Sequence, residues 1–136
     1  CVVLGGGLVG TETAEYVASK GYKVTIVEMM DKIAAQESAT VMPLIEVDFK
    51  KHGVISYVNT KVNEIKNNVI YAQNTSDNTS VEIKADTIIN ALGSKKNVLD
   101  ESKLSVPFVY VGDCSGERTA DIASAIRTGY KAGNEL

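Results

Sequence analysis

The chain has 136 residues, of which 44% are hydrophobic and 23% charged, a composition typical of one globular domain. A net charge of −3 without a basic block argues against nucleic acid or an anionic membrane as the main partner. The two cysteines, Cys1 and Cys114, form no CxxC or metal-ligand pattern, and no apolar run reaches the length of a membrane span, so we expect a cytoplasmic location.

Strands and helices are predicted to alternate along the first part of the chain. Apolar runs and helical periodicity predict strands at residues 1–4, 23–28 and 54–58 and helices at residues 8–20 and 43–51. Gly21 and Gly53 follow the two helices, where glycine commonly ends a helix, and Pro43 suits a first helical turn. Residues 29–40 are predicted to be irregular.

The pattern changes in the second half of the chain. Short alternating runs, separated by turns rich in Asn, Asp and Ser, predict a β-meander with strands at residues 62–65, 69–73 and 81–84. A nearly continuous apolar run at residues 86–92 predicts a strand covered on both faces. A polar connection (94–106), a last strand (108–111) and a helix (120–136) follow. The predicted fold class is α/β, a Rossmann-type three-layer fold with a central parallel sheet and a β-meander.

A glycine pattern, Gly-Gly-Gly-Leu-Val-Gly at positions 5–10, joins the first strand to the first helix. Gly5 permits a tight turn, Gly7 allows bare backbone to approach a pyrophosphate, and Gly10 lets the helix lie close to the sheet. Glu28 ends the second strand 23 residues after Gly5, near the offset of about 20 residues expected for a carboxylate that binds the adenosine ribose. The alternative for Glu28 is an exposed carboxylate at a strand end.

Backbone amides at the start of the first helix complete this predicted site. Unpaired N–H groups and about half a positive charge at the helix N-terminus favour bound phosphates. The candidate cofactor-binding residues therefore include Leu8 and Val9 in the first turn, and Met29 beside Glu28. The pattern predicts a dinucleotide-binding βαβ unit.

Two later motifs carry a resemblance to a known family. Asp-Thr-Ile-Ile-Asn-Ala-Leu-Gly occupies positions 86–93, and Val-Tyr-Val-Gly-Asp-Cys occupies positions 109–114. With the glycine pattern and the meander, they resemble the two-dinucleotide-domain flavoprotein reductases, in which an NAD(P)H-binding domain is inserted into an FAD-binding domain. The resemblance implies that residues 1–105 are the NAD(H)-binding domain and that residues 106–136 return to the FAD-binding domain.

The resemblance also implies roles for single residues. Gly112 and Asp113 match the second FAD motif, in which the aspartate hydrogen-bonds the flavin ribityl chain. Glu12 matches a glutamate near the nicotinamide. Val62 matches a meander residue whose backbone meets the adenine, and Gly93 a position close to the nicotinamide. The alternatives are a first-turn carboxylate for Glu12, a core valine for Val62, a strand end for Gly93 and a loop cap for Asp113.

Within the family, the sequence is most similar to the C-terminal region of NADH:flavin oxidoreductases of the enoate and 2,4-dienoyl-CoA reductase type. Val-Glu-Met at positions 27–29, Asp-Lys-Ile-Ala at 31–34 and Asn-Thr-Lys-Val at 59–62 carry this likeness. Such proteins join an old-yellow-enzyme barrel, with FMN and an iron–sulfur cluster, to FAD and NADH domains. The expected partner is therefore the rest of a parent flavoprotein. Pyridine-nucleotide-disulfide reductases and NADH oxidases share the general plan.

The sequence also departs from the family pattern. It contains no first FAD fingerprint, no iron–sulfur cysteine cluster and no redox-active cysteine pair. Gly112 and Asp113 are therefore half an FAD site, and we expect a piece of a longer enzyme that is inactive alone. No residue is a convincing acid, base or nucleophile, and a single histidine excludes a zinc cluster, so no catalytic or metal-binding residue is predicted.

The sequence thus predicts an NADH-binding domain of an FAD-dependent oxidoreductase, which presents the nicotinamide for hydride transfer to flavin. Two alternatives stay open. The glycine turn could bind the ADP half of FAD, in a disulfide reductase or an NADH oxidase. The chain could also be a nucleotide-binding module without a redox role.

Overall fold

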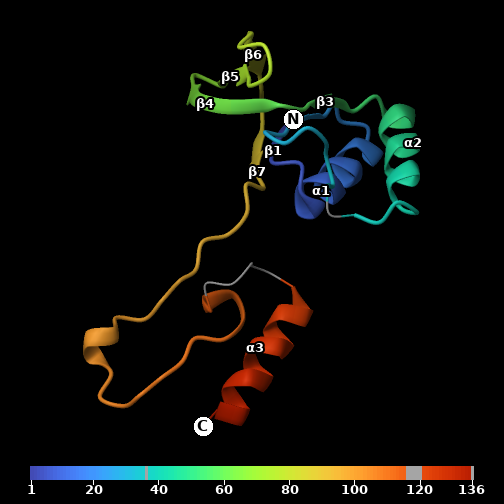
Figure 1. The fold of residues 1–136 in the computed structure, drawn as a ribbon. Coiled ribbons are helices and arrows are strands. Elements are labelled where there is room, and N and C mark those ends of the chain that lie inside the picture. The colour runs from blue at the N-terminus through green and yellow to red at the C-terminus, as the bar shows by residue number, and fades with distance from the viewer. Residues whose placement is uncertain (36, 116–120, 136) are drawn as a thin grey trace. The chain divides into compact units, whose positions relative to one another are not determined.

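The computed structural model describes residues 1–35, 37–115 and 121–135 (Figure 1). The chain divides into two compact units, Cys1–Gly93 and Ser94–Leu136, and each unit is described separately. The expected boundary between residues 105 and 106 is a functional assignment, and it stays a prediction.

A four-stranded parallel sheet forms the centre of the first unit. Its strands are β1 (Val2–Leu4), β2 (Thr25–Val27), β3 (Ile55–Tyr57) and β7 (Ile88–Asn90), in the order β3-β2-β1-β7. All neighbouring strands run parallel, and Leu4 is paired with Val27 on one side and with Asn90 on the other. The carboxyl ends of β1, β2 and β7 therefore lie along one edge of the sheet.

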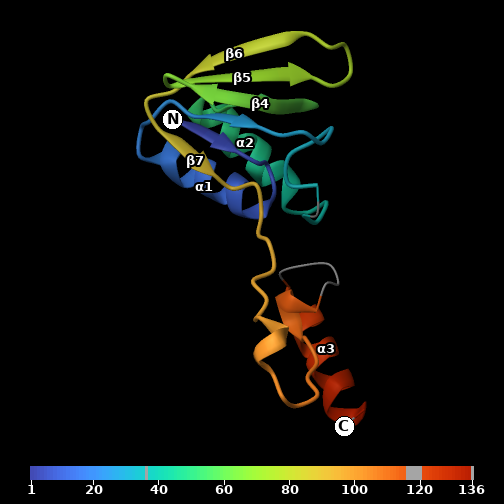
Figure 2. The same ribbon diagram turned by 90° about the vertical axis from the view of Figure 1, so that its left-hand side faces the viewer.

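Helices cover one face of the parallel sheet, and an antiparallel sheet covers the other (Figure 2). The helices are α1 (Leu8–Ser19) and α2 (Met42–His52). The antiparallel sheet consists, in spatial order, of β4 (Thr60–Lys66), β5 (Val69–Asn74) and β6 (Ser80–Lys84). This arrangement confirms the predicted α/β Rossmann-type fold with a central parallel sheet and a β-meander.

Two hydrophobic clusters hold the three layers together, because side chains alternate between the faces of a strand. The buried residues between the parallel sheet and the helices are Val3, Ala14, Ala18, Val24, Ile26 and Phe49. The buried residues between the two sheets are Val2, Leu4, Val27, Ile70, Ala72, Ile83 and Ala85. Ile88 packs against the cluster between the sheets, and Ile89 packs against the cluster at the helices. Strand β7 is therefore covered on both faces, as predicted.

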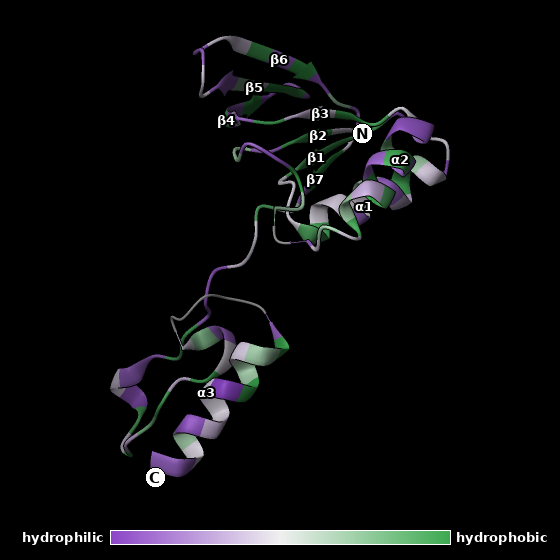
Figure 3. Ribbon diagram, turned by 45° about the vertical axis from the view of Figure 1, so that its right-hand side comes forward, coloured by the Kyte–Doolittle hydropathy of each residue, from purple (hydrophilic) through white to green (hydrophobic). Residues whose placement is uncertain are grey.

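The described residues of the second unit form two 3-10 turns and one long helix. These are η1 (Glu101–Lys103), η2 (Gly112–Cys114) and α3 (Ile122–Glu135). Both hydrophobic and hydrophilic residues occur along α3 (Figure 3). Residues 120 and 136, where the predicted last helix begins and ends, lie outside the described residues.

The predicted strand at residues 108–111 is wrong. These residues are extended or irregular, and no strand occurs among residues 94–115 and 121–135. A strand is stabilised by a hydrogen-bonded neighbour, and no second strand is present in this described part of the unit. Instead, the Tyr110 hydroxyl donates to Oε1 of Glu101 at 3.1 Å, and the Tyr110 ring meets Phe108 edge-on at 5.3 Å.

Candidate functional site

The glycine turn between β1 and α1 contains two positions where a side chain does not fit. Gly5 has a φ of +98°, and a Cβ added there would lie 2.4 Å from the carbonyl oxygen of Ala91. A Cβ added at Gly10 would lie 1.8 Å from the carbonyl oxygen of Gly5. Both neighbours are backbone atoms, which cannot swing aside as a flexible side chain can. The tight turn and the close approach of helix and sheet therefore require glycine at these positions.

The start of α1 is open beside this turn. Gly7 is the N-cap residue, no described side chain caps the helix there, and a Cβ added at Gly7 would meet no atom within 4 Å. Leu8 and Val9 in the first turn are 39% and 70% exposed. An accessible helix start with free amide groups and partial positive charge suits an anionic phosphate.

The middle glycine of the turn, Gly6, is held from three directions. Its N–H donates to Oε2 of Glu28 at 2.6 Å. Its carbonyl oxygen accepts from the N–H of Ala34 at 2.6 Å and from the hydroxyl of buried Thr11 at 3.2 Å. Gly6, Thr11 and Ala34 are not among the site residues that the sequence predicts. The only local signal was a fourth glycine inside the glycine pattern.

Glu28 lies half-buried at the carboxyl end of β2, and both of its carboxylate oxygens are oriented by backbone donors. Oε2 accepts from Gly6, and Oε1 accepts from the N–H of Met30 at 2.7 Å. A carboxylate offers about four acceptor positions, so each oxygen can accept a further donor such as a ribose hydroxyl. Met29, next along the chain, is 56% exposed. The structure thus brings the predicted carboxylate to the glycine turn.

The other candidate residues of the first unit lie on three different elements. Glu12 is exposed on α1, and the first turn of α1 contains no acidic residue. The alternative prediction, that Glu12 is a carboxylate in the first helical turn, is therefore wrong. Val62 is partly buried on β4 and packs against the cluster between the sheets, as its core alternative predicts. Gly93 is exposed with a φ of +93°. The cofactor contacts of these three residues stay predictions.

Gly112 and Asp113 lie in η2 of the second unit. Gly112 has a φ of +61°, and its N–H donates to Oγ1 of Thr128, a buried residue of α3, at 2.8 Å. This bond ties the turn to the helix. The role of both residues in FAD binding stays a prediction.

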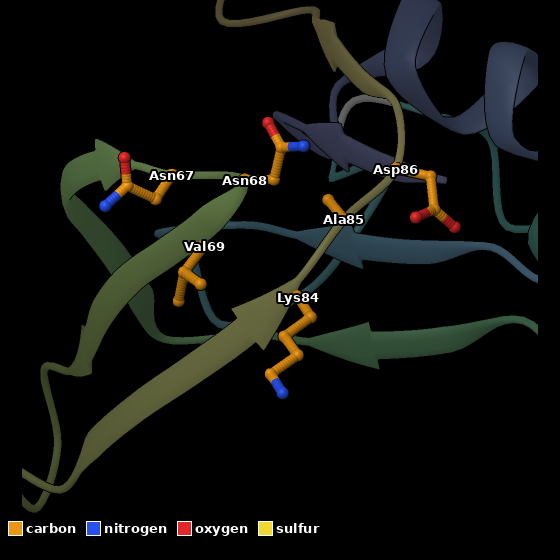
Figure 4. A pocket seen from close by; sticks show the side chains of 6 residues that line it. All are labelled: Asn67, Asn68, Val69, Lys84, Ala85 and Asp86. Atoms are coloured by element: carbon orange, nitrogen blue, oxygen red, sulfur yellow. The ribbon is translucent and has the colours of Figure 1, made fainter.

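A shallow pocket of about 260 Å³ lies away from the glycine turn (Figure 4). Its lining comes from the β4–β5 turn and the segment before β7, and consists of Asn67, Asn68, Val69, Lys84, Ala85 and Asp86. The pocket is therefore near the amino end of β7, whereas the glycine turn is at the carboxyl end of β1. None of the predicted cofactor residues lines it.

Glu15 of α1 interacts electrostatically with Asp48 and His52 of α2. Burial raises the pKa of Glu15, and the hydrogen bond to Asp48 and the negative charges of Asp48 and Glu12 raise it further, while His52 lowers it. Within residues 1–35, 37–115 and 121–135, no three His, Cys, Asp or Glu side chains gather where they could hold a metal ion. None of the helices in the described ranges has the length and apolar character needed to cross a membrane.

The parallel sheet, the glycine turn and the carboxylate at the end of β2 are the parts of a Rossmann-type domain. The family model for pyridine nucleotide-disulphide oxidoreductases matches residues 1–129. The chain belongs to this family.

Individual relatives agree with this assignment. Bilirubin reductase of Mediterraneibacter gnavus (strain CC55_001C) is 43% identical over 99% of the chain, and dihydrolipoyl dehydrogenase of Mycobacterium leprae (strain TN) is 36% identical over 71%. The solved structure of a 2-naphthoyl-CoA reductase complex matches 99% of the chain with a TM-score of 0.76 and 29% identity. The chain spans 21% of the length of each of these relatives, all of which are oxidoreductases.

Proposed function

We propose that the unit Cys1–Gly93 binds NADH and presents its nicotinamide to a flavin held by the rest of a longer flavoprotein. The observation that carries the proposal is the Glu28 carboxylate, which is hydrogen-bonded to Gly6 and so held at the glycine turn. The open space at Gly7 and the uncapped start of α1 offer a phosphate position next to it. NADH supplies a hydride when bound, and the residues of this chain bind and orient it.

Glu28 also supports a preference for NADH over NADPH. Its carboxylate can accept from both hydroxyls of the adenosine ribose, whereas it would repel the 2′-phosphate of NADPH. Among residues 28–35, Lys32 is the only cation, and Asp31 beside it is negative. The segment therefore offers no surplus of positive charge to offset the repulsion.

The proposal is tested by titrating the chain with NADH and NADPH and following NADH fluorescence. We expect NADH to bind at least about tenfold more tightly than NADPH, because a close like-charge contact costs several kcal/mol. Glu28→Gln should weaken the binding of NADH and reduce the difference between the NADH and NADPH affinities. Glu82→Gln, at an exposed position of β6, should change neither affinity. Equal dissociation constants for the two cofactors would contradict the proposed role of Glu28. Binding of FAD but not NADH would favour the alternative of an FAD-binding turn.

The parent protein is proposed to be an NADH:flavin oxidoreductase of the enoate and 2,4-dienoyl-CoA reductase type. Bilirubin reductase and 2-naphthoyl-CoA reductase match the chain over 99% of its length, whereas the dihydrolipoyl dehydrogenase matches over 71%. The proposed partner of this chain is then the remainder of that protein, an FAD domain with an FMN and iron–sulfur barrel.

Residues 106–136 are proposed to complete the FAD domain of the parent. An apolar stripe on α3 supports this assignment, because Ile122, Ile126 and Tyr130 are 80%, 66% and 74% exposed. Burying three such side chains against a neighbouring domain would contribute about 1.5–3 kcal/mol each. The chain alone should neither retain FAD on gel filtration nor reduce a substrate. Stoichiometric flavin in the purified chain would contradict the assignment of half a site.

A further inference from the structure

Asn90 ends β7 beside the glycine turn. It is paired with Leu4, the residue before Gly5, and the carbonyl oxygen of Leu4 accepts from the N–H of Ala91 at 2.8 Å. Asn90 is exposed, so its side chain is accessible at the carboxyl edge of the sheet. The site residues expected from the sequence did not include it.

The hydrogen bonds of this turn determine how the side-chain amide of Asn90 is oriented. Its Oδ1 accepts from the backbone N–H of Leu92 at 3.1 Å. A backbone N–H needs an acceptor, so the amide oxygen and not the NH₂ group must occupy this position. The two N–H donors of the amide make no hydrogen bond to any residue in the described parts of the chain. They are left for a ligand or for water.

The strand order shows which part of a dinucleotide would reach these donors. Strand β2, which ends at Glu28, lies on one side of β1, and β7 lies on the other. A dinucleotide with its adenosine ribose at Glu28 and its pyrophosphate over the glycine turn therefore continues towards β7.

We propose that the Asn90 amide donates hydrogen bonds to the oxygens of the ribosyl phosphate on the nicotinamide side of NADH. This inference rests on the proposed NADH-binding function. It adds a residue that binds the nicotinamide half of the cofactor, whereas the Glu28 carboxylate binds the adenosine half.

Two ligands separate the halves of the cofactor: NADH, and AMP, which lacks both the nicotinamide ribose and the phosphate attached to it. In calorimetric titrations, Asn90→Ala should lower the affinity for NADH by about fivefold or more, as expected for a lost hydrogen bond. The same variant should bind AMP within about twofold of the unaltered chain. Circular dichroism checks that the variant is folded.

A second variant tests the donors without removing the bond to Leu92. Asn90→Asp keeps the acceptor oxygen but replaces the donors with a negative charge. The affinity for NADH should therefore fall by about tenfold or more, and this loss of affinity should be smaller at high salt. The matched control is Asn67→Asp in the β4–β5 turn, which adds the same charge near the amino end of β7 (Figure 4). This control should bind NADH as tightly as the unaltered chain.

The outcomes distinguish this inference from the proposed function. If the unaltered chain binds no NADH, both are wrong. If the unaltered chain binds NADH and the two Asn90 variants bind it equally well, only the inference is wrong. Equal losses of NADH and AMP affinity in Asn90→Ala would also overturn it, because Asn90 would then hold the turn and not contact the nicotinamide half.

Discussion

Replacement of Gly10 by alanine tests the close approach of α1 to the parallel sheet. The new Cβ would lie 1.8 Å from the carbonyl oxygen of Gly5 and 3.3 Å from the Cβ of Ala91. Heavy atoms in favourable contact lie about 3.5 Å apart. The helix and the turn must therefore separate by more than an ångström, because the atom in the way belongs to the backbone.

The cost of this separation follows from what α1 buries. Ala14 and Ala18 are 0% and 3% exposed and pack with Val3 of β1. Forcing extra volume into such a contact costs about 1–3 kcal/mol and occasionally more, whereas alanine recovers about 1 kcal/mol of helix propensity over glycine. A clash this close belongs at the upper end of that range. We expect the free energy of unfolding to fall by about 2 kcal/mol or more.

Urea unfolding followed by circular dichroism measures this loss. The matched control is Gly7→Ala, the same substitution in the same turn, where the new Cβ meets no atom within 4 Å. Its cost should stay below about 1 kcal/mol, since alanine is only a poorer N-cap residue than glycine. Similar unfolding midpoints for the two variants would refute the close packing at Gly10.

Two further predictions concern protonation and a buried bond. Burial and Asp48 raise the pKa of Glu15 in the folded chain, so the free energy of unfolding should fall as pH rises from the ordinary value of 4.5 through the raised pKa. Glu15→Gln should remove this pH dependence. If the urea midpoints of the variant change with pH as those of the unaltered chain do, the role of Glu15 is contradicted. Thr128→Val removes the acceptor for the Gly112 N–H and should cost the second unit about 1–3 kcal/mol and speed hydrogen exchange at that amide. Thr128→Ser keeps the hydroxyl, so the Gly112 amide should exchange at nearly the original rate in this variant. Equally slow exchange of the Gly112 amide in the valine variant would show that the hydrogen bond does not protect it.

Local patterns in the sequence were sufficient to predict the βαβ unit and its carboxylate. A strand, a glycine turn, a helix and a second strand have nearly fixed lengths, so the offset of 23 residues from Gly5 brings Glu28 to the same edge of the sheet. The β4–β5 turn was predictable for a similar reason. Asn67 and Asn68 have φ values of 50° and 61°, and asparagine tolerates this left-handed conformation better than most residues.

Only the tertiary structure decided which distant segments meet. The pairing of β1 with β7 places Asn90 beside Leu4, and the loop after β2 brings Ala34 to the carbonyl oxygen of Gly6. The apolar run at residues 108–111 shows the opposite outcome, since it has the composition of a strand but no strand beside it in the described part of its unit. The physical reason is the same in each case. A backbone hydrogen bond between strands needs a partner from elsewhere in the chain, and the residue pattern of one segment does not specify that partner.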